Sequence, residues 1–237
     1  MIPSYFDKYT ARARLAPCLI VALPLAAASL PYYDNSYGWG FFSLFFVQIS
    51  IAVLISQFCR DAGKKAEDEI FGDRLPHIRL LRFSDDQYSE QKKKRIHDTL
   101  LSCCFCGSIS AEEERNNPER ADNIYSLWCE WLKQYVRTKD HFYLVREENS
   151  NYGFRRNLYG LKKIWALSIL CGLIIFSANL TINTLIRAEN IVTFLLIACN
   201  ILSWCCVTKK WVTMAAHEYA SQLHLAALAI PFPENGK

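Results

Sequence analysis

Four long runs of the chain lack charged residues: residues 15–33, 35–59, 164–186 and 190–208 contain no Asp, Glu, Lys or Arg. Each run has 19 residues or more, and about 20 apolar residues cross the hydrocarbon core of a bilayer as a helix. The pattern predicts four transmembrane helices in two hairpins. Neither a soluble domain nor a secreted disulfide scaffold is expected from such a pattern.

The basic residues lie almost entirely on one side of these spans. Of the 27 Lys and Arg, three fall in residues 1–14, twenty in residues 60–163 and three in residues 209–237, so only Arg187 lies in an expected outer loop. Cytoplasmic flanks of membrane helices carry the excess of Lys and Arg. We therefore expect a multi-pass protein with both termini and the central segment in the cytoplasm.

The first run has two unusual features. Residues 26–28 (AAA) resemble a signal-peptidase site, so a cleaved signal peptide is an alternative to a retained span. Pro24 interrupts the apolar stretch and the second run follows almost at once, which favours a span. Pro17, Pro24 and Pro31 recur every seven residues, which predicts a kinked helix whose bend is either fixed by packing, the commoner outcome, or a hinge.

The expected fold class is an all-α integral membrane protein with four transmembrane helices in two hairpins and a mostly helical cytoplasmic domain inserted between them. Residues 1–59 form the first hairpin, residues 60–163 the cytoplasmic domain, residues 164–208 the second hairpin and residues 209–237 an amphipathic cytoplasmic tail. The central segment holds 20 basic and 18 acidic residues, enough for one small domain.

Apolar residues at three- and four-residue steps predict an amphipathic helix from Pro118 to Arg137. Residues 75–83 alternate poorly and contain a proline, which indicates an extended connector or a short strand. A second helix is expected over about 87–101, with N-cap candidates at 84–86. The tail, residues 211–230, is expected to form an amphipathic or partly buried helix.

A third cytoplasmic helix is expected to begin near His141, kink near Gly153 and continue into the third span. Gly153 and Gly160 are the candidate hinge of this connector, through which a cytoplasmic event would reach the membrane. Within the spans, Asn179, Asn183 and Asn200 are either interhelical hydrogen-bonding groups or the lining of an aqueous pore. No Asp, Glu, Lys, Arg or His lies inside a span, which argues against a proton-coupled transporter.

The sequence holds none of the phosphate-loop, zinc-protease, nucleophile-elbow or dinucleotide motifs, so we do not expect an enzyme or a cofactor. His217 and His224 are seven residues apart, and Cys103, Cys104 and Cys106 lack paired spacing, so no metal site is predicted. Four basic residues of the domain are candidates for binding phosphate or anionic lipid: Arg79, Arg82, Arg137 and Arg146. Near-neutral net charge favours lipid or solvent for such residues.

The stretch EENSNYGFRRNLYGLK at residues 147–162 is similar to a signature found in small bacterial membrane proteins encoded beside nucleotidyltransferases in anti-phage defence. Residues 80–82 and 117–125 also resemble this family, which is identified with the channel effector of the Hailong system. Arg155 and Arg156 match the signature and are added to the candidate ligand-binding residues. The resemblance covers roughly residues 60–165.

The resemblance implies a homotetrameric channel in the bacterial inner membrane. Its ligand would be a single-stranded DNA oligomer or a cyclic nucleotide made by the partner nucleotidyltransferase, and opening would depolarise the membrane. The alternative is a non-enzymatic membrane scaffold or envelope-stress regulator without a nucleotide ligand. We expect a homo-oligomer, the lipid bilayer and the nucleotide as partners.

Overall fold

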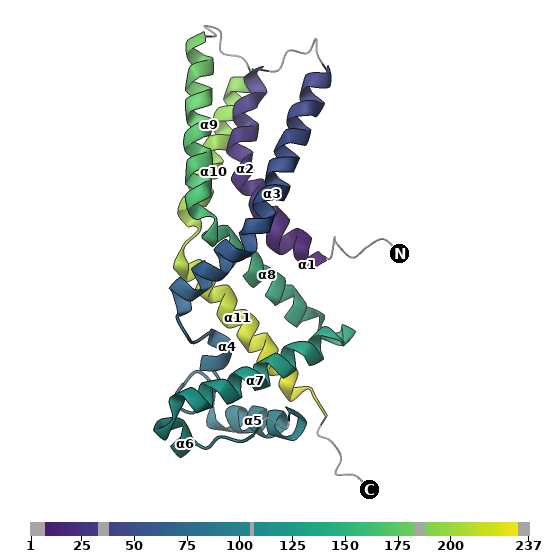
Figure 1. The fold of residues 1–237 in the computed structure, drawn as a ribbon, viewed down its shortest axis with the longest axis vertical. Coiled ribbons are helices and arrows are strands. Elements are labelled where there is room, and N and C mark those ends of the chain that lie inside the picture. The colour runs from purple at the N-terminus through teal and green to yellow at the C-terminus, as the bar shows by residue number, and fades with distance from the viewer. Residues whose placement is uncertain (1–7, 33–37, 105–106, 183–187, 232–237) are drawn as a thin grey trace. The chain divides into compact units, whose positions relative to one another are not determined.

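The computed structural model describes residues 8–32, 38–104, 107–182 and 188–231, and every regular element among them is a helix (Figure 1). The expected all-α class is therefore confirmed. The elements are α1 (Lys8–Thr10), a π-helical turn (Ala11–Leu15), α2 (Ala16–Ser29), a 3-10 turn (Leu30–Tyr32), α3 (Gly38–Phe71), α4 (Pro76–Arg79), α5 (Glu90–Cys104), α6 (Ala111–Asn116), α7 (Pro118–Arg137), a 3-10 turn (Asp140–Phe142), α8 (Tyr143–Gly160), α9 (Lys162–Ile182), α10 (Ala188–Cys206) and α11 (Lys209–Leu228).

The chain forms two compact units. The first consists of Met1–Glu69 and Gly153–Val212, and the second of Ile70–Tyr152 and Thr213–Lys237. Each unit is described separately below, as the membrane unit and the helical unit.

Three helices of the membrane unit are long and apolar enough to cross a membrane: Lys8–Ser29, Lys162–Ile182 and Ala188–Cys206. They match three of the four expected runs, and their length and composition are compatible with a membrane protein. The second run, residues 35–59, falls in α3, whose first part lies largely outside the described side chains. The fourth span and the orientation of the termini therefore stay predictions.

Helices α2, α9 and α10 all pack against one another. The buried residues of α9 recur at three- and four-residue steps and include Trp165, Gly172 and Phe176, whereas Leu167 and Ile174 are exposed on the opposite face. The outer face is thus apolar, whereas the buried face also carries Ser168 and Asn179. This arrangement suits lipid outside and interhelical hydrogen bonds inside.

The proline at position 17 is accommodated by a hydrogen bond from another helix. A proline has no backbone N–H, so Pro17 leaves the carbonyl of Ala13 without its usual helical donor. The preceding residues form the π-helical turn, and Asn157 Nδ2 of α8 donates to Ala13 O at 2.7 Å. Asn157 is buried, so this bond satisfies a carbonyl that water does not reach.

The other two prolines are also fixed by packing. Pro31 removes the usual helical donor of Ala27 O, and two other groups donate to that carbonyl: the backbone N–H of Leu30, and Thr193 Oγ1 of α10 at 3.0 Å. At Pro24 the backbone approaches α9 so closely that a Cβ on Gly172 would lie 2.9 Å from Pro24 O. The described contacts therefore support the packing interpretation of the three prolines over the hinge interpretation.

The helical unit has an aromatic and aliphatic core. The predicted helix from Pro118 to Arg137 is confirmed as α7, and the core residues on its inner face include Tyr125, Trp128 and Leu132. His97 of α5 lies with its ring centroid 5.2 Å from that of Trp128. The predicted tail helix is confirmed as α11.

Two sequence predictions for the helical unit were wrong. Residues 75–83 include the short helix α4 rather than a strand, because Leu75 is extended and Pro76 then occupies the first helical turn, where its missing N–H costs nothing. Helix α5 begins at Glu90, and Ser89 rather than residues 84–86 lies at its start, with its hydroxyl accepting from Lys92 N at 3.3 Å. Asp85 instead closes a turn by accepting from Gln87 N.

Helix α8 runs without a break through Gly153. The break falls at Leu161, immediately after Gly160. Neither Gly153 nor Gly160 has a positive φ. Both lie instead where another segment comes close: Tyr9 and Ala13 near Gly153, and the Ala62 backbone near Gly160.

Candidate functional site

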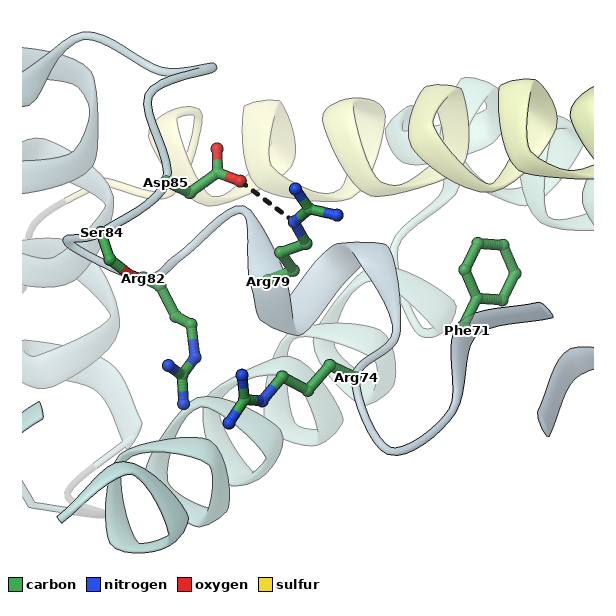
Figure 2. A pocket seen from close by; sticks show the side chains of 6 residues that line it. All are labelled: Phe71, Arg74, Arg79, Arg82, Ser84 and Asp85. Carbon is green, nitrogen blue, oxygen red and sulfur yellow. Dashed lines mark ion pairs between the residues drawn. The ribbon is translucent and has the colours of Figure 1, made fainter. Parts of the chain in front are cut away.

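A basic cavity in the helical unit is the strongest candidate site. It has a volume of about 390 Å³, which lies within the usual range for small-molecule sites. Figure 2 shows the side chains that line it: Phe71, Arg74, Arg79, Arg82, Ser84 and Asp85. We call it the arginine pocket.

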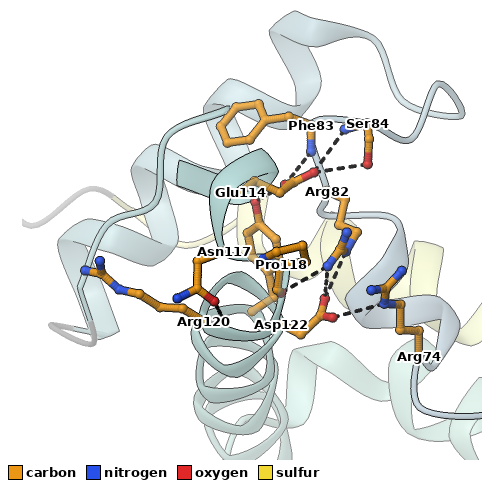
Figure 3. Close-up of polar contacts among 10 residues, drawn as sticks. Arg74, Arg82, Phe83, Ser84, Glu114, Asn117, Pro118, Arg120 and Asp122 are labelled. Atoms are coloured by element: carbon orange, nitrogen blue, oxygen red, sulfur yellow. Dashed lines mark hydrogen bonds and ion pairs between the residues drawn. The ribbon is translucent and has the colours of Figure 1, made fainter. Parts of the chain in front are cut away.

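Helix α4 and the turns on either side of it bring the three arginines together. Pro76 fixes the start of α4, so Arg74 precedes the helix, Arg79 is its last residue and Arg82 follows in the next turn. Figure 3 shows Arg82 and Arg74 both directed at Asp122 of α7. The short helix that the sequence did not predict is therefore what assembles the pocket.

Arg82 is the fixed base of the pocket. Its Nη2 lies 2.6 Å from Asp122 Oδ1 and 3.2 Å from Pro118 O, and its side chain is only 10% exposed. The same carboxylate accepts from Arg74 Nε at 3.0 Å. Arg82 is thus paired and mostly buried, and it holds the turn after α4 on α7. Loss of either partner of such an ion pair is destabilising, because it leaves the other charge buried without a counter-charge.

Arg74 and Arg79 remain accessible. Their side chains are 50% and 61% exposed, and Arg79 Nε lies 3.4 Å from Asp85 Oδ2. Three guanidinium groups and the Asp85 carboxylate line the pocket, and the carboxylates of Asp122 and Glu114 hold the lining from behind. An incoming anion would replace Asp85 as the partner of Arg79, because guanidinium groups bind phosphate with charge-assisted hydrogen bonds.

A buried carboxylate supports the other wall of the pocket. Glu114 of α6 accepts from Phe83 N at 3.0 Å, from Ser84 N and Oγ, and from Tyr125 Oη at 2.7 Å (Figure 3). Burial alone would raise the pKa of Glu114, but the hydrogen bonds from Tyr125 and from residues 83 and 84 outweigh it and hold the pKa below its usual value. Glu114 is therefore ionised and rigidly placed.

The remaining predicted ligand-binding residues of the helical unit lie elsewhere. Arg137 is exposed at the far end of α7, fifteen residues from Asp122, which is roughly 22 Å along a helix. Arg146 donates to Lys139 O at 2.7 Å and to Asp140 O at 3.1 Å. Neither lines the arginine pocket, so the four predicted arginines do not form one site.

Arg155 and Arg156 belong to the membrane unit and have structural partners. Arg155 donates to Trp211 O at 3.1 Å and lies over the Trp211 ring. Arg156 pairs with Glu67 of α3, and both side chains are mostly buried. These contacts give the two signature arginines a role in joining helices within the membrane unit.

The predicted pore amides are directed into the helix bundle of a single subunit. Asn200 Oδ1 accepts from Trp165 Nε1 at 3.2 Å, and Asn179 is buried on α9. Asn183 lies outside the described residues. The Asn200 contact favours the interhelical interpretation of that residue over the pore interpretation.

A buried histidine pair in the helical unit was not predicted. His224 of α11 donates from Nε2 to His77 O at 3.0 Å and accepts at Nδ1 from Tyr88 Oη at 3.2 Å. His77 Nε2 accepts from the Lys133 ammonium at 2.8 Å. Both imidazoles are thus neutral, and burial lowers the pKa of His224 to about 3. In the described part of the chain, no three His, Cys, Asp or Glu side chains form a group that could hold a metal ion.

Sequence reasoning had placed Arg79 and Arg82 among the ligand-binding candidates but did not predict that Arg74, Ser84 and Asp85 join them. Comparison with known proteins gives no match to a family model, to a curated protein or to a solved structure.

Proposed function

We propose that the protein is an oligomeric membrane channel effector, gated by an oligonucleotide that binds in the arginine pocket. The observation that carries the proposal is the pocket itself: Arg74 and Arg79 are exposed around one cavity, and Arg82 is fixed beneath them. Phosphodiester groups are anions that such guanidinium groups bind. The resemblance of residues 147–162 to defence effectors supports the same ligand class.

The way the chain passes between its two units supports coupling of ligand to membrane. The boundaries fall after Glu69, Tyr152 and Val212, and each lies inside a helix, α3, α8 and α11 respectively. A helix carries a displacement along its axis better than a flexible linker does. In this proposal the ligand biases the spans because it binds their open and closed arrangements with different affinity.

In cells, the proposed protein lies in the bacterial inner membrane with the arginine pocket in the cytoplasm, and a change in ligand during phage infection opens the channel and depolarises the membrane. Subunits assemble as a tetramer. No catalytic step is assigned to the chain.

The binding half of the proposal is tested with a short single-stranded DNA and the detergent-solubilised full chain. We expect affinity to fall as salt rises from about 50 to about 200 mM, because bound phosphates release counterions. Arg79→Ala should weaken binding and reduce the slope of log affinity against log salt by about 0.7 for each lost phosphate contact. Arg137→Ala removes the same charge from an exposed position outside the pocket and should leave binding unchanged.

Absence of DNA binding at low salt would reject the oligonucleotide ligand. Binding that is equally sensitive to Arg79→Ala and Arg137→Ala would reject the arginine pocket as its site.

One observation favours a second candidate, a membrane scaffold or regulator that conducts no ions. Asn179 and Asn200 are both buried within one subunit, so neither amide lines a path between subunits. Vesicles that contain this protein would then keep their ion gradients whether or not nucleotide is present.

A further inference from the structure

The first and last turns of the second hairpin meet in the membrane unit. Lys162, the first residue of α9, donates from Nζ to Val207 O at 2.6 Å, just beyond the end of α10. Trp204 Nε1 returns a hydrogen bond to Lys162 O at 3.0 Å. Since α9 and α10 are consecutive spans, these contacts place the start of one and the end of the next at the same surface of the membrane.

This junction is strongly basic. Residues 153–163 and 203–212 contain six Lys and Arg and no Asp or Glu. Arg156 is neutralised by Glu67, and Lys162 is engaged with Val207. Three lysines of the junction have exposed side chains: Lys163, Lys209 and Lys210.

Two tryptophans contact the other two cations of the junction, Lys162 and Arg155. The Lys162 ammonium lies 4.4 Å from the centre of the Trp204 ring, and the Arg155 guanidinium lies 4.8 Å from the centre of the Trp211 ring. Indole rings concentrate at the level of lipid headgroups because they are apolar with one N–H donor. The rings therefore mark the depth at which headgroup phosphates lie.

We propose that Lys163, Lys209 and Lys210, with Trp204 and Trp211 at their base, form a binding site for the headgroup of an anionic phospholipid. The lysines supply the charge that a phosphodiester headgroup with net negative charge requires, and basic side chains at the ends of spans attract such lipids. The hydrogen bonds of Lys162 and Trp204 hold the ends of α9 and α10 together beneath the headgroup.

Lipid is favoured over a nucleic acid as the occupant. The cations follow directly on the ends of two apolar helices whose outer faces are exposed Leu, Ile and Phe. The acyl chains of a lipid can lie along those faces, whereas a nucleic acid has no apolar part to bury there. This site is separate from the arginine pocket and does not depend on its ligand.

The test uses the full chain reconstituted in phosphatidylcholine vesicles that contain increasing fractions of brominated phosphatidylglycerol, which quenches tryptophan fluorescence on contact. We expect preferential quenching by phosphatidylglycerol over brominated phosphatidylcholine. The double variant Lys163→Gln/Lys210→Gln should lose about fivefold in relative affinity for each lysine, roughly 25-fold in all. Glutamine keeps the length of the polar side chain, and helical content measured by circular dichroism checks that the fold is retained.

The matched control is Lys94→Gln/Arg95→Gln, which removes the same charge from exposed positions on α5 of the helical unit, where no apolar run adjoins them. It should leave the preference for phosphatidylglycerol unchanged. Equal quenching by the two lipids, or an equal effect of the two double variants, would overturn the proposal. Displacement of phosphatidylglycerol from wild type by short single-stranded DNA, in a manner lost in Lys163→Gln/Lys210→Gln, would assign the site to nucleic acid and likewise overturn it.

Discussion

The hydrogen bond from Asn157 to Ala13 O gives a quantitative prediction about how the membrane unit tolerates Pro17. Asn157→Ala removes the donor and leaves the buried Ala13 carbonyl unsatisfied. An unsatisfied buried acceptor costs about 1–3 kcal/mol. Truncation to alanine adds a packing loss, so we expect the free energy of unfolding to fall by roughly 2–4 kcal/mol in total.

A double-mutant cycle separates the hydrogen bond from the packing loss. Pro17→Ala restores a backbone N–H that can donate to Ala13 O, so in that background Asn157→Ala should cost about 1–2 kcal/mol less. The packing loss is the same in both backgrounds and cancels. Pro24→Ala provides the control, because the carbonyl that Pro24 leaves without a donor is that of Ile20 and not the acceptor of Asn157.

The assay is equilibrium unfolding of the purified protein in detergent micelles by a denaturant, followed by tryptophan fluorescence. We predict a coupling of about 1 kcal/mol or more between Asn157 and Pro17, and additivity within about 0.5 kcal/mol between Asn157 and Pro24. Equal coupling to both prolines would refute the argument that Asn157 compensates for the donor missing at Pro17.

Three further predictions concern both units. Glu114→Ala should destabilise the helical unit by about 2–4 kcal/mol in chemical unfolding, because Tyr125 Oη and two backbone N–H groups lose their acceptor; an unchanged midpoint would contradict this. The folded-state pKa of His224 is about 3 and the unfolded value is about 6.5, so the unfolded chain binds the proton first as pH falls, and this histidine should lower stability by about 2 kcal/mol at pH 5. Burial lowers the pKa of His77 as well, so His224→Leu should reduce the dependence of the unfolding midpoint on pH without abolishing it, and an unchanged dependence would contradict this. Gly160→Ala should lower thermal stability by about 1–3 kcal/mol, because its Cβ would overlap the Ala62 backbone; a stabilised variant would show that helix propensity outweighs that overlap.

Periodicity and charge predicted the parts of the structure that depend on burial alone. The three- and four-residue steps of Ala121, Ile124 and Trp128 gave α7 with its correct bounds, since an amphipathic face must be buried. The charge-free runs gave α9 and α10 because a bilayer requires about 20 apolar residues in a row. Both signals are local and need no knowledge of neighbouring segments.

The pocket could not be predicted in the same way. Arg82 and Asp122 are 40 residues apart, and nothing local indicates that they pair. The short helix α4 depends on Pro76, which occupies its first turn, whereas the sequence had suggested an extended connector or a short strand. Asn157 and Ala13 likewise meet only through the fold, although Pro17 in an apolar run does indicate that some carbonyl needs a donor from outside its helix.

The central claim is that nucleotide bound in the arginine pocket controls ion flow through the membrane. Its most direct test is the decay of a potassium diffusion potential across vesicles that contain the purified protein, with and without short single-stranded DNA. We predict a potential whose decay rate changes when DNA is added, a change that is lost in Arg79→Ala and retained in Arg137→Ala. A potential that decays at the rate of empty vesicles under all these conditions, in protein of oligomeric size that binds DNA, would contradict the account.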